Sequence, residues 1–149
     1  MRMIGGKIEL FVDDLARSTD FYRDALGFEV GETRFAERDG VQLAHVPVWN
    51  GGIVIGLGLH DHHHFRRGRG AEDLRGIGTE LCFYAEPAEL EDWHERARAH
   101  AGSGFEPLEL RPWGARDFRV VDPDGYYLRI SEPDKDHTEY GDGRATQAS

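Results

Sequence analysis

The chain has 149 residues, of which 39% are hydrophobic and 31% are charged, and its formal net charge is −10. That length predicts one domain with a substantial core, and the negative charge disfavours binding to nucleic acids or anionic membranes while favouring cationic ligands. No apolar run approaches the ~20 residues of a membrane helix, and the N-terminus lacks the apolar stretch of a secretory signal. Because the lone cysteine, Cys82, has no partner for an internal disulfide, we expect a cytoplasmic protein.

The first half of the chain shows strand and helix periodicities in a fixed order. Asp14 is a plausible N-cap for a helix, and Gly27 lies where a left-handed glycine commonly ends one. The pattern predicts one helix between strands, over residues 7–13 (strand), 15–26 (helix), 28–34, 41–48 and 53–59 (strands).

The second half repeats that order, with a helix that Pro87 opens and Gly102 closes. The expected elements are residues 79–85 (strand), 87–101 (helix), 106–110, 117–121 and 126–131 (strands). This repetition predicts an α+β protein with mostly antiparallel sheets and a helix on one face of each.

The chain organisation expected from these patterns is a single domain over residues 1–133. Its parts are a first module at 7–59, a polar linker at 60–76 and a second module at 77–132. Residues 134–149 are polar and acidic, with too few apolar side chains to offset the entropy of ordering, so we expect a disordered tail.

Two segments carry a resemblance to a known family. Residues 8–28, IELFVDDLARSTDFYRDALGF, run from strand to helix to a glycine stop, and residues 111–133, RPWGARDFRVVDPDGYYLRISEP, place two apolar strands around a DPDG turn. Together they resemble the vicinal oxygen chelate superfamily, which includes glyoxalase I, extradiol dioxygenases, and fosfomycin- and bleomycin-resistance proteins. The resemblance implies two βαβββ modules whose mixed sheets curl into a cup for the ligand. In many members the first and last strands of each module also hold a divalent metal there.

The residues at the metal positions depart from the family pattern. Lys7 stands where relatives have a histidine and Arg129 where they have a glutamate, and neither binds a divalent cation. For the second module's first strand we choose Glu80 as the cup-facing residue, because the other register buries a carboxylate against the helix.

Strand alternation extends this choice to neighbouring side chains. It places Lys7, Glu9 and Phe11, and likewise Tyr127, Arg129 and Ser131, toward the cup. We therefore hypothesise that Lys7 and Arg129 replace the metal's positive charge and pair with Glu9 or Glu80, since buried charges persist only when paired. No metal or other cofactor is expected.

The motif PWG-x-R-x-F-x-x-x-DP-x-G of the metal-free bleomycin-resistance proteins is nearly matched by Pro112, Trp113, Gly114, Arg116, Phe118, Asp122, Pro123 and Gly125. In that group the tryptophan stacks on the ligand, so Trp113 is the first candidate for ligand contact. Further candidates for the ligand-binding wall are Phe35, Trp49, Tyr84, Phe118, Tyr127 and Arg129. The resemblance implies an antibiotic-resistance or related protein that sequesters an aromatic ligand. The negative net charge of the chain favours a ligand that is positively charged.

Two other functions remain open from the residues. One is a metal-dependent lyase, isomerase or dioxygenase that uses Glu80 with Glu9 or His45 as ligands. The other is a metal-free enzyme in which Lys7, Glu9 or Glu80 transfers protons. The partners expected are a small-molecule ligand and, on family grounds, a second copy in a homodimer. The linker histidines, His60 and His62 to His64, are adjacent on a loop and do not define a tetrahedral metal site.

Overall fold

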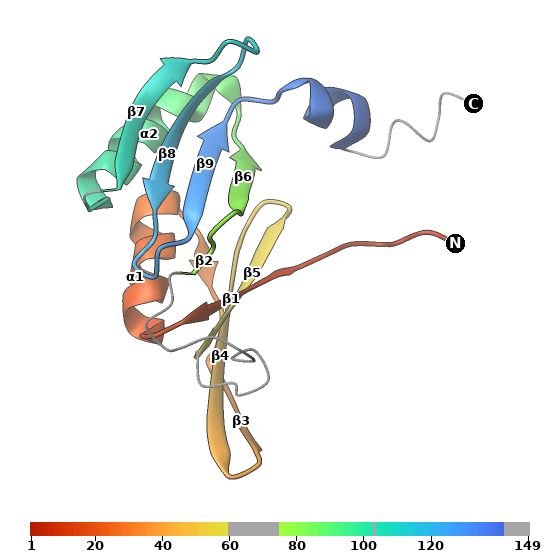
Figure 1. Cartoon of the computed structure of the whole chain (residues 1–149), viewed down its shortest axis with the longest axis vertical. Coiled ribbons are helices and arrows are strands. Elements are labelled where there is room, and N and C mark those ends of the chain that lie inside the picture. The colour runs from red at the N-terminus through yellow and green to blue at the C-terminus, as the bar shows by residue number, and fades with distance from the viewer. Residues whose placement is uncertain (60–74, 103, 142–149) are drawn as a thin grey trace.

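The computed structural model describes residues 1–59, 75–102 and 104–141. The histidine cluster of the linker and the last eight residues of the predicted tail lie outside the described residues. The described chain forms two mixed sheets, each with one α-helix, and the segment before the first strand leads away from them (Figure 1).

The first sheet, sheet A, comes from the first half of the chain. Its strands run in the order β1-β5-β4-β2, and β3 also pairs with β4. Strands β1 and β5 are parallel, whereas the other pairs are antiparallel. The elements are β1 (Ile8–Val12), α1 (Leu15–Leu26), β2 (Glu29–Val30), β3 (Arg34–Arg38), β4 (Val41–Asn50) and β5 (Ile53–Leu59).

The second sheet, sheet B, repeats this arrangement in the order β6-β9-β8-β7, again with its outer pair, β6 and β9, parallel. The α+β class with two mixed-sheet modules is thereby confirmed, and the first module carries one strand more than the predicted βαβββ pattern. The elements are β6 (Glu80–Tyr84), the 3₁₀ helix η2 (Pro87–Glu89), α2 (Leu90–His100), β7 (Phe105–Leu110), β8 (Arg116–Val121) and β9 (Tyr127–Ser131). A π-helical turn, His137–Gly141, lies within the segment predicted to be a tail.

Local sequence signals explain where α1 begins and ends. The Asp14 carboxylate accepts a hydrogen bond from the Arg17 backbone N–H at 3.0 Å, and Gly27 ends the helix at φ 64°.

The prediction of one strand over residues 28–34 was wrong. The structure has the two-residue β2 and then β3, which forms a hairpin with β4 through Asp39 and Gly40, both at positive φ.

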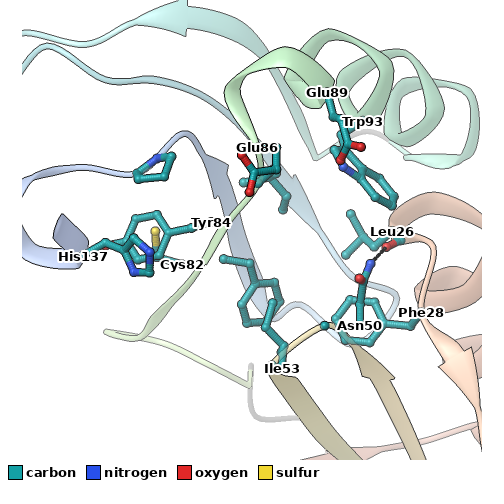
Figure 2. Close-up of a pocket in the computed structure, with 16 residues that line it drawn as sticks. Leu26, Phe28, Asn50, Ile53, Cys82, Tyr84, Glu86, Glu89, Trp93 and His137 are labelled. Carbon is teal, nitrogen blue, oxygen red and sulfur yellow. Dashed lines mark hydrogen bonds between the residues drawn. The ribbon is translucent and has the colours of Figure 1, made fainter. Parts of the chain in front are cut away.

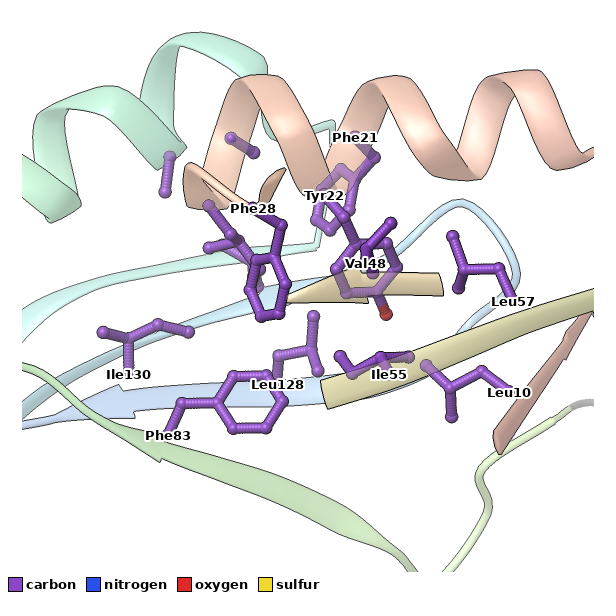
Figure 3. Close-up of a cluster of buried hydrophobic side chains, with 14 of the residues drawn as sticks. Leu10, Phe21, Tyr22, Phe28, Val48, Ile55, Leu57, Phe83, Leu128 and Ile130 are labelled. Atoms are coloured by element: carbon purple, nitrogen blue, oxygen red, sulfur yellow. The ribbon is translucent and has the colours of Figure 1, made fainter. Parts of the chain in front are cut away.

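One core joins the two modules, and it lies between the helices and the strands (Figure 3). The predicted alternation is confirmed, because Leu10, Val12, Phe83, Leu128 and Ile130 are all buried on the helix side. Helices α1 and α2 contact each other. The faces of the sheets opposite the helices, here called the open faces, therefore carry the alternate residues of each strand.

The DPDG turn of the second module holds the first module. The buried Tyr22 hydroxyl on α1 donates to Asp122 at 2.8 Å. Asp124 accepts hydrogen bonds from the Asp13 backbone N–H and the Ser18 hydroxyl, and its Oδ1 lies 2.7 Å from an Arg75 guanidinium nitrogen. Within the described residues, no helix is long and apolar enough to cross a membrane.

Candidate functional site

The open face of sheet A carries a cluster of three polar side chains. The Glu9 carboxylate forms an ion pair with Lys7, and its Oε2 lies 3.2 Å from Nε2 of His45. Glu9 lies on β1 and His45 on β4, with β5 between them. A Cβ atom at Gly56 of β5 would overlap both Glu9 Oε2 and His45 Nε2, so the glycine is what allows the two side chains to meet across β5.

Beside this cluster is a cavity of about 360 Å³, here called the sheet A pocket. Its wall is mainly apolar, and Phe35, one of the lining residues, is 74% exposed. The lining residues are Glu9, Phe11, Arg34, Phe35, Ala36, Leu43, Ala44, His45 and Gly58. A small apolar cavity with a few convergent polar groups is typical of a small-molecule site.

Substitution of Gly56 by alanine tests the role of that glycine. We expect Gly56→Ala to separate Glu9 from His45, because the new methyl group occupies the space between their polar ends. The ring resonances of His45 in NMR spectra should shift, while the unfolding free energy should change by about 1 kcal/mol or less, since both side chains are partly exposed and can move. Gly58→Ala is the control, because a Cβ there meets only the Phe11 ring at an ordinary 3.6 Å. Unchanged His45 resonances in Gly56→Ala would contradict this role.

The open face of sheet B carries an ion-pair network around a fully buried carboxylate, Asp117. Nε of Arg111 donates to Asp117 Oδ1 at 2.7 Å, and Nε of Arg119 lies 3.5 Å from the same oxygen. Nε of Arg129 lies 2.8 Å from Oε1 of Glu80. The guanidinium of Arg129 also lies 5.8 Å from the centroid of the Trp113 ring, which is about half exposed in the loop between β7 and β8.

Both hypothesised ion pairs are therefore present, Lys7 with Glu9 and Arg129 with Glu80. The two pairs lie on different sheets. In the described part of the chain, no three His, Cys, Asp or Glu side chains gather as a metal site, so Glu80 does not join Glu9 and His45. Among the described residues, Glu9 and Glu80 are thus poor ligands for a divalent metal ion, because each carboxylate is paired with a cation.

The aromatic residues that were predicted to form one ligand-binding wall lie at separate places in the structure. Trp49 lies on β4 opposite Val54 of β5, and Tyr84 lies on β6, where its hydroxyl donates to Asp134 at 2.9 Å. The Tyr127 hydroxyl donates to Glu106 at 3.0 Å. The expectation that Phe118 contacts ligand needs correction: its side chain is fully buried, because alternation along β8 turns it toward the helix side.

Sequence reasoning missed Asp117, Arg119 and Arg111. The first two alternate with buried Phe118 and Val120 along β8, so the same alternation argument places them on the open face. Arg111 precedes the loop that carries Trp113, and no periodicity marks it.

Cys82 is a weak nucleophile in this structure. Burial raises the pKa of its thiol, and the nearby Arg129 only partly offsets that effect. Burial and the hydrogen bond to Asp134 also raise the pKa of the Tyr84 hydroxyl, so it keeps its proton to a higher pH than an exposed tyrosine.

Comparison with known proteins gives a family and a set of similar folds. The model of the Glyoxalase/Bleomycin resistance protein/Dioxygenase superfamily matches residues 6–130. No curated protein matches the chain. A glyoxalase-related enzyme from Fulvimarina pelagi is 21% identical, with a TM-score of 0.64 and coverage of 89% of both chains.

Two further solved structures show the same fold. TioX from Micromonospora sp. ML1 is 19% identical, with a TM-score of 0.64 over 86% of this chain and 98% of its own. Lactoylglutathione lyase from Agrobacterium tumefaciens is 24% identical, with a TM-score of 0.55 over 85% of this chain and 90% of its own. At these identities the similarity concerns the fold alone.

Proposed function

The chain belongs to the glyoxalase/bleomycin resistance protein/dioxygenase superfamily, and on that premise we propose that it sequesters an aromatic small molecule, an antibiotic or another natural product, without a metal ion. The observation that carries the proposal is the pairing of both candidate carboxylates with cations, Glu9 with Lys7 and Glu80 with Arg129. A divalent ion would have to displace both cations to be coordinated, which makes a metal-dependent reaction at these residues the weaker alternative.

The sheet A pocket is the proposed place of binding. Its volume of about 360 Å³ suits a small aromatic group, since ligand pockets commonly measure about 300–1,000 Å³. Phe35, on β3 opposite Ala44, is a largely exposed aromatic residue of the lining, and Glu9 with His45 offers polar contacts at one side. This arrangement orients an aromatic ligand by its polar substituents and stabilises it by its ring.

A homodimer belongs to the same proposal. The two polar clusters of one chain lie on separate sheets, so a second copy that sets its sheet B against sheet A of the first would complete a cup. In that arrangement Trp113 of one copy would face the Phe35 side of the other.

We expect metal-free protein to bind bleomycin or another member of a panel of flat aromatic antibiotics. Phe35→Ala should weaken that binding about 2- to 30-fold, which corresponds to the loss of one aromatic contact of about 0.5–2 kcal/mol. Calorimetric titration in the presence of EDTA gives both affinity and stoichiometry. Leu110→Ala is the matched control, because Leu110 is an exposed apolar residue that does not line the pocket. Binding only after addition of Zn²⁺ or Mn²⁺, or equal affinity in both variants, would refute the proposal.

A metal-free enzyme is a second candidate, favoured by the hydrogen bond between Glu9 and His45. A carboxylate that orients an imidazole is a common arrangement for a general base. Mass spectrometry of the recovered probes separates the two functions. A probe changed by wild-type protein but not by His45→Ala would establish catalysis in place of sequestration.

A further inference from the structure

A second cavity, of about 440 Å³, lies where the two modules meet, and we call it the junction cleft (Figure 2). The first module contributes the turn between β4 and β5, including Asn50 and Ile53. The second contributes β6, η2 and Trp93 of α2. The junction cleft shares no lining residue with the sheet A pocket.

The wall of the junction cleft is aromatic and apolar, and its aromatic side chains are held in place. Leu26, Phe28 and Trp93 lie together on one side, whereas Tyr84 and His137 lie on the other (Figure 2). The Tyr84 hydroxyl is bound to Asp134, and the centroids of the Tyr84 and His137 rings are 4.6 Å apart. Fixed rings of this kind bind flat or cationic groups without first losing much conformational entropy.

Trp93 is held in place by Arg96, a residue of the same helix, α2. The guanidinium of Arg96 lies 5.6 Å from the Trp93 ring centroid, and it donates to the backbone carbonyls of Asp24 and Arg23 at 2.8 and 2.9 Å. Arg96 therefore supplies hydrogen-bond donors to backbone carbonyls in the last turn of α1. It does not line the junction cleft.

The charge of the lining is negative. The carboxylates of Glu86 and Glu89 lie along the η2 side of the cleft (Figure 2). Among the described residues, neither side chain forms an ion pair or a hydrogen bond, and no Lys or Arg of that part of the chain lines the cleft. Two unpaired carboxylates beside aromatic walls are complementary to a cation that carries apolar groups.

We propose that the junction cleft is a second ligand site, which takes a hydrophobic cation such as an aromatic amine or a quaternary ammonium or phosphonium compound. The apolar groups of the ligand would contact Phe28, Ile53 and Trp93. Its positive charge would lie near Glu86 and Glu89. This site is independent of the aromatic-ligand site proposed on sheet A.

The test uses methyltriphenylphosphonium as the cationic probe and triphenylphosphine oxide as a neutral molecule of nearly the same shape. Calorimetric titration of the full chain should show saturable binding of the cation, with the neutral probe at least about 10-fold weaker. Glu86→Gln and Glu89→Gln should each weaken phosphonium binding about 3- to 10-fold, since each removes one attractive charge and keeps the side-chain shape. Both residues are exposed, so neither variant is expected to affect folding.

Two controls make the outcome decisive. Asp92→Asn on α2 removes the same charge close by but outside the lining, so it should change the affinity less than 2-fold, roughly the long-range electrostatic effect alone. Phe35→Ala should leave phosphonium binding unchanged, because Phe35 belongs to the sheet A pocket. Equal affinity for both probes, equal losses in Asp92→Asn and Glu89→Gln, or loss of binding in Phe35→Ala would each overturn the junction-cleft proposal. Absence of saturable phosphonium binding, as would follow if a second copy occupied the cleft in a stable dimer, would overturn it as well.

Discussion

Asp124→Ala is expected to lower the unfolding free energy by about 3–5 kcal/mol, the typical effect of removing one partner of a buried ion pair. The side chain of Asp124 is fully buried, and that of Arg75 is 9% exposed. Without the carboxylate, the Arg75 guanidinium keeps only the exposed Asp13 carboxylate and the Phe11 carbonyl, and the Ser18 hydroxyl and the Asp13 backbone N–H lose their acceptor. Urea unfolding followed by circular dichroism measures the loss.

The matched controls for this prediction are a second aspartate and a double variant. Asp92→Ala should change stability by about 0.5 kcal/mol or less, because Asp92 is exposed on α2. In the Arg75→Ala/Asp124→Ala protein the loss should be smaller than the sum of the two single losses, since the contact between the two side chains can be lost only once. Additive losses would mean that the pair does not stabilise the contact between the modules.

Asp122→Ala should lower the unfolding free energy by about 3 kcal/mol, because it removes three hydrogen bonds and leaves the buried Tyr22 hydroxyl without an acceptor. The Asp122 carboxylate accepts backbone N–H bonds from Asp124 and Tyr126, each at 2.9 Å, and the bond from Tyr22. Asp122→Asn keeps one side-chain oxygen to accept the backbone N–H bonds of the turn, so it should lower the unfolding free energy by only about 1 kcal/mol. Equal losses in the two variants would show that the turn does not depend on this oxygen.

The Tyr22 hydroxyl adds a pH dependence to the same contact. Burial, together with the negative charge of Asp122, holds the pKa of Tyr22 well above its usual range. The folded protein therefore keeps the phenol proton at a pH where the unfolded chain has lost it, so stability is complete below about pH 10 and falls as the pH rises above that value. In urea titrations at pH 8 and pH 10.5, Tyr22→Phe should lose less stability between the two pH values than wild type. An equal loss would rule out this role.

Much of the architecture follows from patterns that are local in the sequence. Asp14 and Gly27 mark the ends of α1 because capping depends on a few neighbouring residues. Alternation placed Lys7, Glu9 and Glu80 on the open faces because burial on the opposite side permits only one register.

The parts that sequence reasoning missed depend on the turn between β3 and β4 and on contacts between distant residues. All residues of β3 are exposed, so no hydrophobic pattern marks that strand. Arg111, Asp117 and Arg129 meet on sheet B only because β7, β8 and β9 are neighbours there. Likewise, the separation of the two polar clusters depends on how the modules pack, and spacing along the chain carries no signal for that.

The shared core has a consequence for how the duplicated halves behave. Phe28 of the first module contacts Phe83 of the second, with ring centroids 6.0 Å apart, and Tyr22 reaches across to the DPDG turn. Each half on its own would expose apolar surface that only the other half covers. The internal repeat is therefore not a pair of independently stable units, and the two halves should melt in a single cooperative transition.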